Sequence, residues 1–114
     1  MKKKSWDYRD KGAPYSYWGK VQFSVTIKRG VRFVSTARHG GLMISKGVAE
    51  KELSARALSL APRYGDYYCF EEDCLCDVAF WEHPEWLEAL YEGKREVDKE
   101  ALEKSVNYWY PEFF

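Results

Sequence analysis

Apolar and polar residues alternate strictly over residues 20–28. The apolar members of this run are Val21, Phe23, Val25 and Ile27. A period of two places alternate side chains on opposite faces, so the run predicts a strand with one buried face. A second run, 31–37, places Val31, Phe33 and Ala37 on one face, and the two runs predict a β-hairpin.

The loop of this hairpin follows from the need to keep one face of the sheet apolar. A three-residue loop ending at Gly30 sets Ile27 opposite Val31. It also sets Val25 opposite Phe33, whereas a two-residue loop mixes the two faces. The last position of a three-residue loop requires positive φ, which Gly30 supplies. The three-residue loop is therefore the predicted connection.

The rest of the first half predicts two more strands and one helix. A Tyr-rich segment, 13–18, is typical of a short edge strand. Residues 42–44 predict a third strand of the sheet, after the break at two glycines. Apolar residues at helical spacing predict a helix over 47–60, which Pro62 ends, and 63–68 reads as a loop or short extended piece.

The second half reads as helices. We expect them over 71–82, from Pro84 onward, and over 98–109 with Asp98 as N-cap. Strands followed by helices predict an α+β fold, in which a small antiparallel sheet from the N-terminal half packs on one face against three to four mostly C-terminal helices. The length fits a single domain, 1–114, with residues 1–12 as a flexible basic lead-in.

The net charge of zero hides a split between the two halves of the chain. Lys and Arg outnumber Asp and Glu by 14 to 5 over residues 1–70, and the ratio is 4 to 13 over residues 71–114. Such asymmetry is typical of a surface for a charged partner. Alternatively, the two halves pack together and neutralise each other in the fold.

The three cysteines, and the lack of a recognisable secretory segment or membrane helix, bear on the expected cellular location. The basic start, 1–4, is followed by polar residues rather than an apolar run, and no stretch has the roughly 18 apolar residues of a membrane helix. We therefore expect a cytoplasmic protein with reduced thiols and no membrane partner.

His39, followed by Gly40-Gly41, is a candidate site residue at the end of a predicted strand. The glycines permit close approach of backbone to a ligand, and Arg38 adds positive charge. A general base or an anion contact fits this setting. The alternative is a turn histidine whose glycines serve only the turn geometry.

Three consecutive carboxylates, Glu71, Glu72 and Asp73, form the second candidate group. They suit binding of a divalent ion or acid–base chemistry together with His39. The alternative is that they lie in the first turn of the helix predicted over 71–82, where they favour the positive end of its dipole.

A metal site built on the cysteines is not expected. Cys69, Cys74, Cys76 and His83 lack a pair separated by two residues, and on one helix Cys76 and His83 lie about 10 Å apart. We expect these cysteines to be small core residues, and we expect neither a bound metal nor a cofactor.

The chain ends in a strongly aromatic segment, residues 108–114, which we call the aromatic end. Its candidate partner-binding residues are Tyr108, Trp109, Tyr110, Phe113 and Phe114. Exposed Tyr and Trp commonly anchor protein partners. The acidic helices suit docking on a basic surface, or mimicry of nucleic-acid phosphates, while the scattered cations of the first half make direct nucleic-acid binding unlikely.

Two segments resemble an uncharacterised domain family found in bacteriophage and plasmid proteins. The family shows a Ser-Thr-Pro-x-His-Gly-Gly segment and, further on, an aromatic-Glu-Glu-Asp segment; here the corresponding residues are 35–41 and 68–73. Ala37 stands in place of the proline, and Phe70 in place of the usual tyrosine. The resemblance implies a mobile-element origin and no established activity.

The resemblance implies a cytoplasmic accessory protein of a bacterial host that binds a host protein, as an inhibitor of a defence or replication factor. The aromatic end and the acidic helices are the expected contact, and a homodimer through exposed aromatic residues is an alternative. A second hypothesis is a small enzyme or ligand-binding protein that uses His39 with Glu71, Glu72 or Asp73. A third is an acidic mimic of nucleic acid.

Overall fold

A computed structural model describes residues 15–114, in an α+β fold with a five-stranded antiparallel sheet, a two-stranded sheet and five helices. The predicted lead-in, 1–12, and the start of the predicted edge strand lie outside the described residues. The strands are β1 (Tyr15–Ser16), β2 (Gly19–Lys20), β3 (Phe23–Lys28), β4 (Val31–Ser35), β5 (Gly40–Ser45), β6 (Arg63–Tyr64) and β7 (Tyr67–Glu71). The helices are α1 (Lys46–Glu52), α2 (Ala55–Leu60), α3 (Cys76–Glu82), α4 (Pro84–Tyr91) and α5 (Lys99–Trp109).

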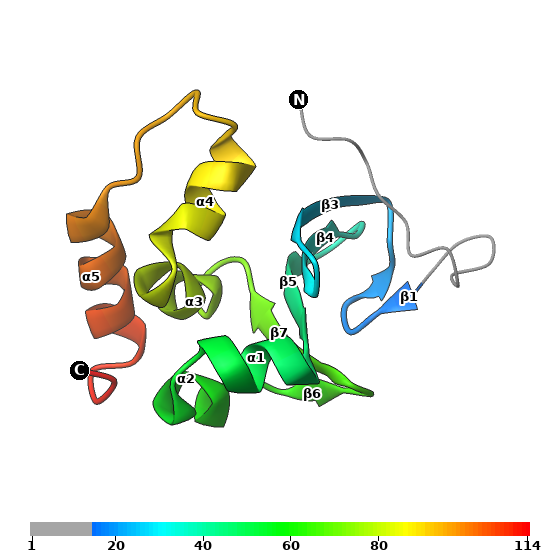
Figure 1. Cartoon of the computed structure of the whole chain (residues 1–114), viewed down its shortest axis with the longest axis horizontal. Coiled ribbons are helices and arrows are strands. Elements are labelled where there is room, and N and C mark those ends of the chain that lie inside the picture. Colours follow the sequence, from blue (N-terminus) through cyan, green and yellow to red (C-terminus); the bar gives the residue numbers. More distant parts are fainter. Residues whose placement is uncertain (1–14) are drawn as a thin grey trace.

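The larger sheet has the order β3-β4-β5-β7-β6, and β1 pairs only with β2. Helices α3, α4 and α5 stand to one side of the larger sheet, and β1 lies on its other side (Figure 1). Strand β5 therefore occupies the centre, between β4 and β7. The predicted α+β class is confirmed, with the helices gathered on one face of the sheet.

The β3–β4 hairpin confirms part of the predicted register. Val25 lies opposite Phe33, as expected, and Gly30 has φ +84°. Nearer the turn, however, Lys28 lies opposite Val31, because the register shifts by one residue at Ile27. The extra residue shortens the loop, and Ile27 still packs against the main core. The predicted pairing of Ile27 with Val31 is therefore wrong.

The helix predicted over 47–60 is two helices. Leu53 is extended and buried, and Ser54 caps α2 by accepting a hydrogen bond from the Ala57 amide. The amide and hydroxyl of Ser54 both donate to the Glu82 carboxylate, at the end of α3. A partner 28 residues away fixes this break, so helical periodicity alone did not reveal it.

The helix predicted from residue 71 begins later. Residues 67–71 form β7, a turn follows, and α3 starts at Cys76. Strand β7 pairs along its whole length with β5, where Phe70 lies opposite Leu42. The other helical predictions are confirmed: Pro84 opens α4, and Asp98 caps α5 by accepting from the Ala101 amide.

The main core lies between the sheet and the helices. Its largest buried side chains include Trp86, Phe70, Leu42, Ile44, Val78 and Val106. A second, smaller cluster covers the opposite face of the sheet, where Trp18 and Tyr67 pack over buried Val34 and Met43. Within residues 15–114 no helix combines the length and the apolar character that a membrane crossing requires.

Candidate functional site

His39 lies in the turn between β4 and β5, and Thr36 fixes the backbone of that turn. The Thr36 hydroxyl donates to the His39 carbonyl at 2.6 Å and accepts from the His39 amide at 3.2 Å. The Thr36 amide also donates to the His39 carbonyl, at 2.9 Å. A threonine three residues before the histidine is a local signal for such a turn, and it is visible in the sequence itself.

Gly40 and Gly41 are required because neighbouring strands approach their backbone closely. A Cβ on Gly40 would lie 2.4 Å from the Val34 carbonyl oxygen in β4. A Cβ on Gly41 would lie 2.1 Å from the Phe70 carbonyl oxygen in β7. The two glycines thus let the central strand start between its two neighbours, and they hold His39 next to the end of β7.

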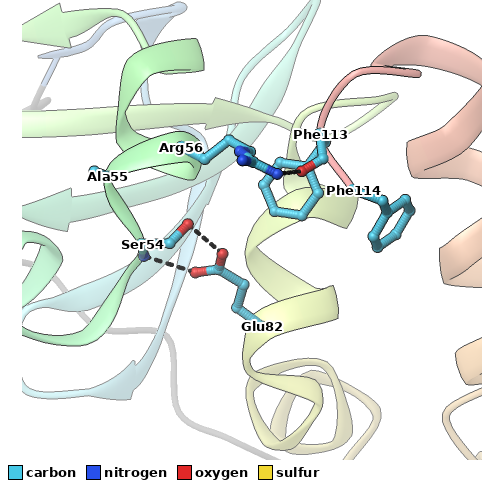
Figure 2. Close-up of a pocket in the computed structure, with 6 residues that line it drawn as sticks. All are labelled: Ser54, Ala55, Arg56, Glu82, Phe113 and Phe114. Atoms are coloured by element: carbon cyan, nitrogen blue, oxygen red, sulfur yellow. Dashed lines mark hydrogen bonds between the residues drawn. The ribbon is translucent and has the colours of Figure 1, made fainter.

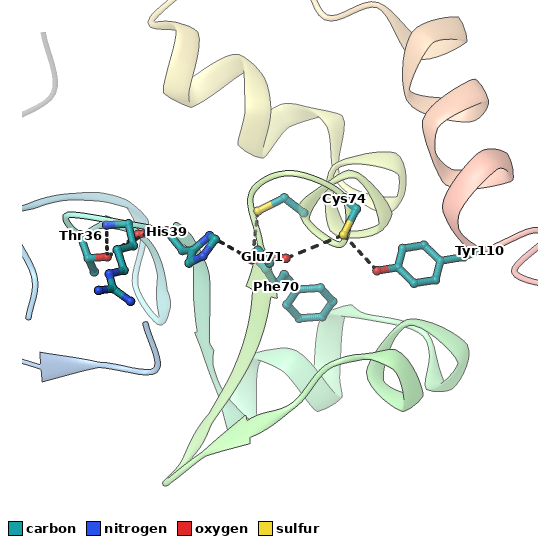
Figure 3. A network of polar contacts seen from close by, with 8 residues as sticks. Thr36, His39, Phe70, Glu71, Cys74 and Tyr110 are labelled. Carbon is teal, nitrogen blue, oxygen red and sulfur yellow. Dashed lines mark hydrogen bonds and ion pairs between the residues drawn. The ribbon is translucent and has the colours of Figure 1, made fainter. Parts of the chain in front are cut away.

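His39, Glu71 and Asp73 come together in space, and we call these three residues the His39 cluster. Gly41 lies opposite Glu71 in the β5–β7 ladder, which brings the histidine turn beside the end of β7. One ligand atom from each of the three side chains lies within 4.8 Å of the others. The His39 Nδ1 atom is 3.4 Å from Glu71 Oε2 (Figure 3).

Glu72 contributes its backbone rather than its side chain. Its amide donates to the Gly40 carbonyl at 2.9 Å, which extends the pairing of β5 and β7 by one bond. The residue is exposed, and among the described residues it is not part of the His39 cluster. Three of the four predicted site residues therefore meet, and the fourth holds the backbone beneath them.

Glu71 also links the cluster to the C-terminal segment. The Cys74 thiol lies 4.0 Å from Glu71 Oε1, and the Tyr110 hydroxyl donates to Cys74 Sγ at 3.4 Å (Figure 3). Burial raises the pKa of Tyr110, and its hydrogen bond to Cys74 raises it further. Sequence alone does not place Cys74 or Tyr110 beside this site, because residues 74 and 110 are brought together only by the packing of α5 on α3.

The other two cysteines belong to the core, as predicted. Cys76 is buried and donates to the Phe70 carbonyl at 2.8 Å, and burial raises its pKa well above the ordinary value. Cys69 is buried on the opposite face of the sheet, where burial raises its pKa to about 12. Both are therefore thiols rather than thiolates near neutral pH, which makes them poor metal ligands and nucleophiles.

The aromatic end divides between the core and the solvent. Phe113 is 8% exposed and packs in the main core, and Tyr110 is half-buried. Tyr108, Trp109 and Phe114 are 75%, 53% and 49% exposed. Helical spacing would place Trp109 on the same face as buried Leu102 and Val106, but it is exposed, since α5 ends there and the turn after it brings Phe113 inward instead.

A groove of about 750 Å³ lies between α2 and the aromatic end. Glu82, Ser54, Arg56, Phe113 and Phe114 line it (Figure 2). Its charged groups already have partners, because Glu82 accepts from Ser54 and Arg56 donates to the Phe113 carbonyl. These contacts across the groove therefore join α2, α3 and the aromatic end.

The chemistry available at the His39 cluster is that of one imidazole and two carboxylates at the surface. His39 and Asp73 are exposed, and the Glu71 side chain is 37% exposed. Such a group can exchange a proton with a bound molecule, or it can ligate a divalent cation.

A family model described as a domain of unknown function, DUF7007, matches residues 12–114. The match covers nearly the whole chain, including both segments that form the His39 cluster. No curated protein and no solved structure matches the chain.

Proposed function

Since this chain belongs to the DUF7007 family, whose description names no activity, we propose its function from its own surface. The chain binds another protein, and the contact is centred on the exposed rings of Tyr108 and Trp109. Its partner presents a basic surface. The finer proposal is that the chain is a mobile-element accessory protein that inhibits a defence or replication factor in the cytoplasm of a bacterial host. Its support is the resemblance of the segments around His39 and Glu71 to those of a phage and plasmid domain family.

The exposure of two neighbouring aromatic side chains carries this proposal. Tyr108 is 75% exposed and Trp109 is 53% exposed, and their ring centroids lie 4.9 Å apart in an edge-to-face arrangement. Phe114, at 49% exposure, packs edge-to-face against Trp81 of α3, with ring centroids 5.1 Å apart. Tyr and Trp are the residue types most enriched at the energetic centres of protein interfaces.

The charge around this surface favours a basic partner. Residues 71–114 carry 13 acidic side chains against 4 basic ones. Glu100 and Glu103 are exposed on α5, where Glu100 pairs with Lys104, and Glu112 is exposed within the aromatic end. An excess of acidic side chains in this part of the chain speeds association with a basic surface and disfavours acidic ones.

The test is capture of a partner from bacterial lysate by tagged wild-type chain and by the double variant Tyr108→Ala/Trp109→Ala. The matched control is Tyr15→Ala, which removes an equally exposed ring (70%) outside the aromatic end. We expect one stoichiometric partner with wild type and with the control, and none with the double variant. Capture is expected to weaken as salt rises, because exposed charges are screened.

Equal capture by the double variant and the wild type would contradict the aromatic contact. If that capture were still lost in high salt, it would favour the acidic mimic instead. Deleting residues 108–114 is not a suitable test, because it removes Phe113 from the core together with the exposed rings.

A second candidate function is a small enzyme or ligand-binding protein that uses the His39 cluster. The observation in its favour is the meeting of His39 with Glu71 and Asp73, from segments some thirty residues apart, within 4.8 Å. A thermal-shift screen of small polar molecules tests it: we expect a ligand to raise the melting temperature of wild type but not of His39→Ala. Ligands that stabilise both equally would contradict this role.

A further inference from the structure

We propose that His39, Glu71 and Asp73 bind a divalent first-row transition metal ion such as Zn²⁺ or Mn²⁺. Metal binding is separate from the protein-binding function. The proposal specifies which ligand the second candidate function would use, a metal ion, and it rests on the same three side chains as that function.

The distances within the His39 cluster fit metal ligands better than direct hydrogen bonds. His39 Nδ1 and Glu71 Oε2 lie 3.4 Å apart, beyond the usual 2.7–3.2 Å of an N–H···O bond. Two ligands that each lie about 2.1 Å from a tetrahedral ion are separated by about 3.4 Å. The third ligand atom completes a group whose members all lie within 4.8 Å, so small side-chain rotations suffice to close it around an ion.

The kinds of ligand atom select the class of metal. One imidazole nitrogen with two carboxylate oxygens suits Zn²⁺, Mn²⁺, Fe²⁺ and their neighbours. Ca²⁺ and Mg²⁺ prefer oxygen ligands alone, so the histidine disfavours them. The two carboxylates also neutralise the charge of a divalent ion at a surface where the ion remains in contact with water.

The backbone beneath the cluster holds the ligands in place before an ion arrives. Thr36 fixes the histidine turn through both its hydroxyl and its amide. The Glu72 amide ties the acidic turn to the Gly40 carbonyl, and Glu71 is the last residue of β7. Glu71 ends a paired strand, and His39 and Asp73 lie in turns next to the paired strands, so the ligands are positioned more precisely than on an unsupported loop.

The open side of the cluster gives the ion a role beyond structure. Three protein ligands leave at least one coordination position to water, which is the pattern of catalytic rather than structural zinc sites. His39 and Asp73 are exposed, so a small substrate can reach that position. A bound ion there polarises an oxygen ligand or lowers the pKa of bound water toward about 7.

Metal titration of the untagged chain tests the site, because a polyhistidine tag would itself bind the ions. Isothermal titration with Zn²⁺ and Mn²⁺ is compared between wild type and three variants: His39→Ala, Glu71→Gln and Asp73→Asn. The matched control is Glu72→Gln, which removes one charge from the same turn without touching the cluster. Circular dichroism confirms that each variant is folded.

We expect one ion per chain, with affinity lowered at least about 100-fold in each of the three variants and little changed in Glu72→Gln. The loss is that large because removing a group that merely orients a ligand already costs about 10–100-fold. At a hundredfold excess over Kd, the ion is expected to raise the melting temperature by about 10 °C. Mn²⁺ is expected to broaden the amide NMR signals of residues 39–41 and 71–73 first.

Absence of one-to-one binding, binding that Glu72→Gln weakens as much as the cluster variants do, or broadening centred elsewhere would each overturn the metal site. None of these results bears on partner capture, which depends on Tyr108 and Trp109. They also leave the ligand screen with His39→Ala as an independent measurement of the second candidate function.

Discussion

The His39 cluster and the aromatic end are two regions that the sequence marks equally clearly and that the fold treats in opposite ways. The cluster unites side chains from segments some thirty residues apart, within 4.8 Å. The aromatic end is continuous in sequence, yet the fold sends Phe113 into the core and leaves Tyr108 in solvent. Whether two residues share a site therefore depends less on their separation in sequence than on the elements of the fold that position them.

The cause of this difference is the element beneath each region. The His39 cluster lies where β5 begins, directly after His39, and where β7 ends, at Glu71, and the register of these paired strands fixes which residues are neighbours. The aromatic end begins on the last turn of a helix and continues into a turn, so successive side chains point in different directions. Substitutions in each region test this account.

Gly41→Ala is expected to have the largest effect, because the site depends on close approach of backbone to backbone. The added Cβ would lie 2.1 Å from the Phe70 carbonyl oxygen. That carbonyl belongs to the β5–β7 pairing, so it cannot move without disrupting the sheet. We expect a loss of about 4 kcal/mol or more in the free energy of unfolding. Urea denaturation followed by circular dichroism measures it.

The control for this substitution is Gly47→Ala, because a Cβ on Gly47 meets no atom within 4 Å. In the helix α1, alanine is expected to increase stability by up to about 1 kcal/mol. Equal stabilities for the two alanine variants would show that the glycines beside His39 are not required by strand packing.

Phe113→Ala is expected to cost about 3 kcal/mol, the lower part of the range for a buried Phe. Phe113 is 8% exposed within the main core, whereas its neighbour Phe114 is 49% exposed. Phe114→Ala is therefore expected to cost less than about 1 kcal/mol, and the pair of variants measures how sharply the aromatic end divides. Denaturation midpoints that fall equally in both variants would contradict that division.

The parts of the fold that sequence predicted are those with a local cause. Alternation identified β3, Pro84 and Asp98 marked helix starts, and Gly30 marked a turn with positive φ. The parts it missed depend on distant partners. The break before α2 needs Glu82, and the bulge at Ile27 reflects packing against the main core.

The same division applies to the candidate site. The residue types in two short segments predicted His39, Glu71 and Asp73, and strand pairing brings these three together. Glu72 was predicted alongside them, because a sequence does not show which way each residue at a strand end points. Cys74 and Tyr110 were not assigned to the site, since their contact exists only after α5 packs on α3.

His83, the second histidine, provides a pH-dependent contrast with exposed His39. Its ring stacks on Trp86, Nε2 contacts the Glu52 carbonyl at 2.7 Å, and Nδ1 contacts the Glu85 carboxylate at 2.7 Å. Burial lowers the pKa of His83, but these hydrogen bonds to Glu52 and Glu85 outweigh it, so the pKa is raised overall. A protonated ring donates to both oxygens at once.

A raised pKa sets the direction of the effect on stability. Protonated His83 stabilises the fold below about pH 6.5, the ordinary pKa of histidine, and this contribution is lost as the pH rises through the higher folded-state pKa. Lys28 pairs with the Glu52 carboxylate at 2.6 Å, so a second cation lies close to this contact.

We therefore expect His83→Gln to cost about 2 kcal/mol at pH 5.5, the range for hydrogen bonds to a charged group, and clearly less at pH 8.5. Thermal or urea unfolding at the two pH values measures the difference, with His39→Ala as the control histidine variant. A cost for His83→Gln that is equal at both pH values, or larger at pH 8.5, would show that the charged form is not what stabilises this contact.

Tyr108→Ala is expected to have the smallest effect on stability, within about 0.5 kcal/mol, because the side chain is 75% exposed. Its ring touches mainly Trp109, itself 53% exposed, so removing it uncovers little of the core. The measurement is the same urea titration used for Phe113→Ala. If Tyr108→Ala leaves the free energy of unfolding unchanged, and the double variant with Trp109→Ala abolishes partner capture, then the ring serves binding rather than stability. A cost near that of Phe113→Ala would instead place Tyr108 with the buried half of the aromatic end.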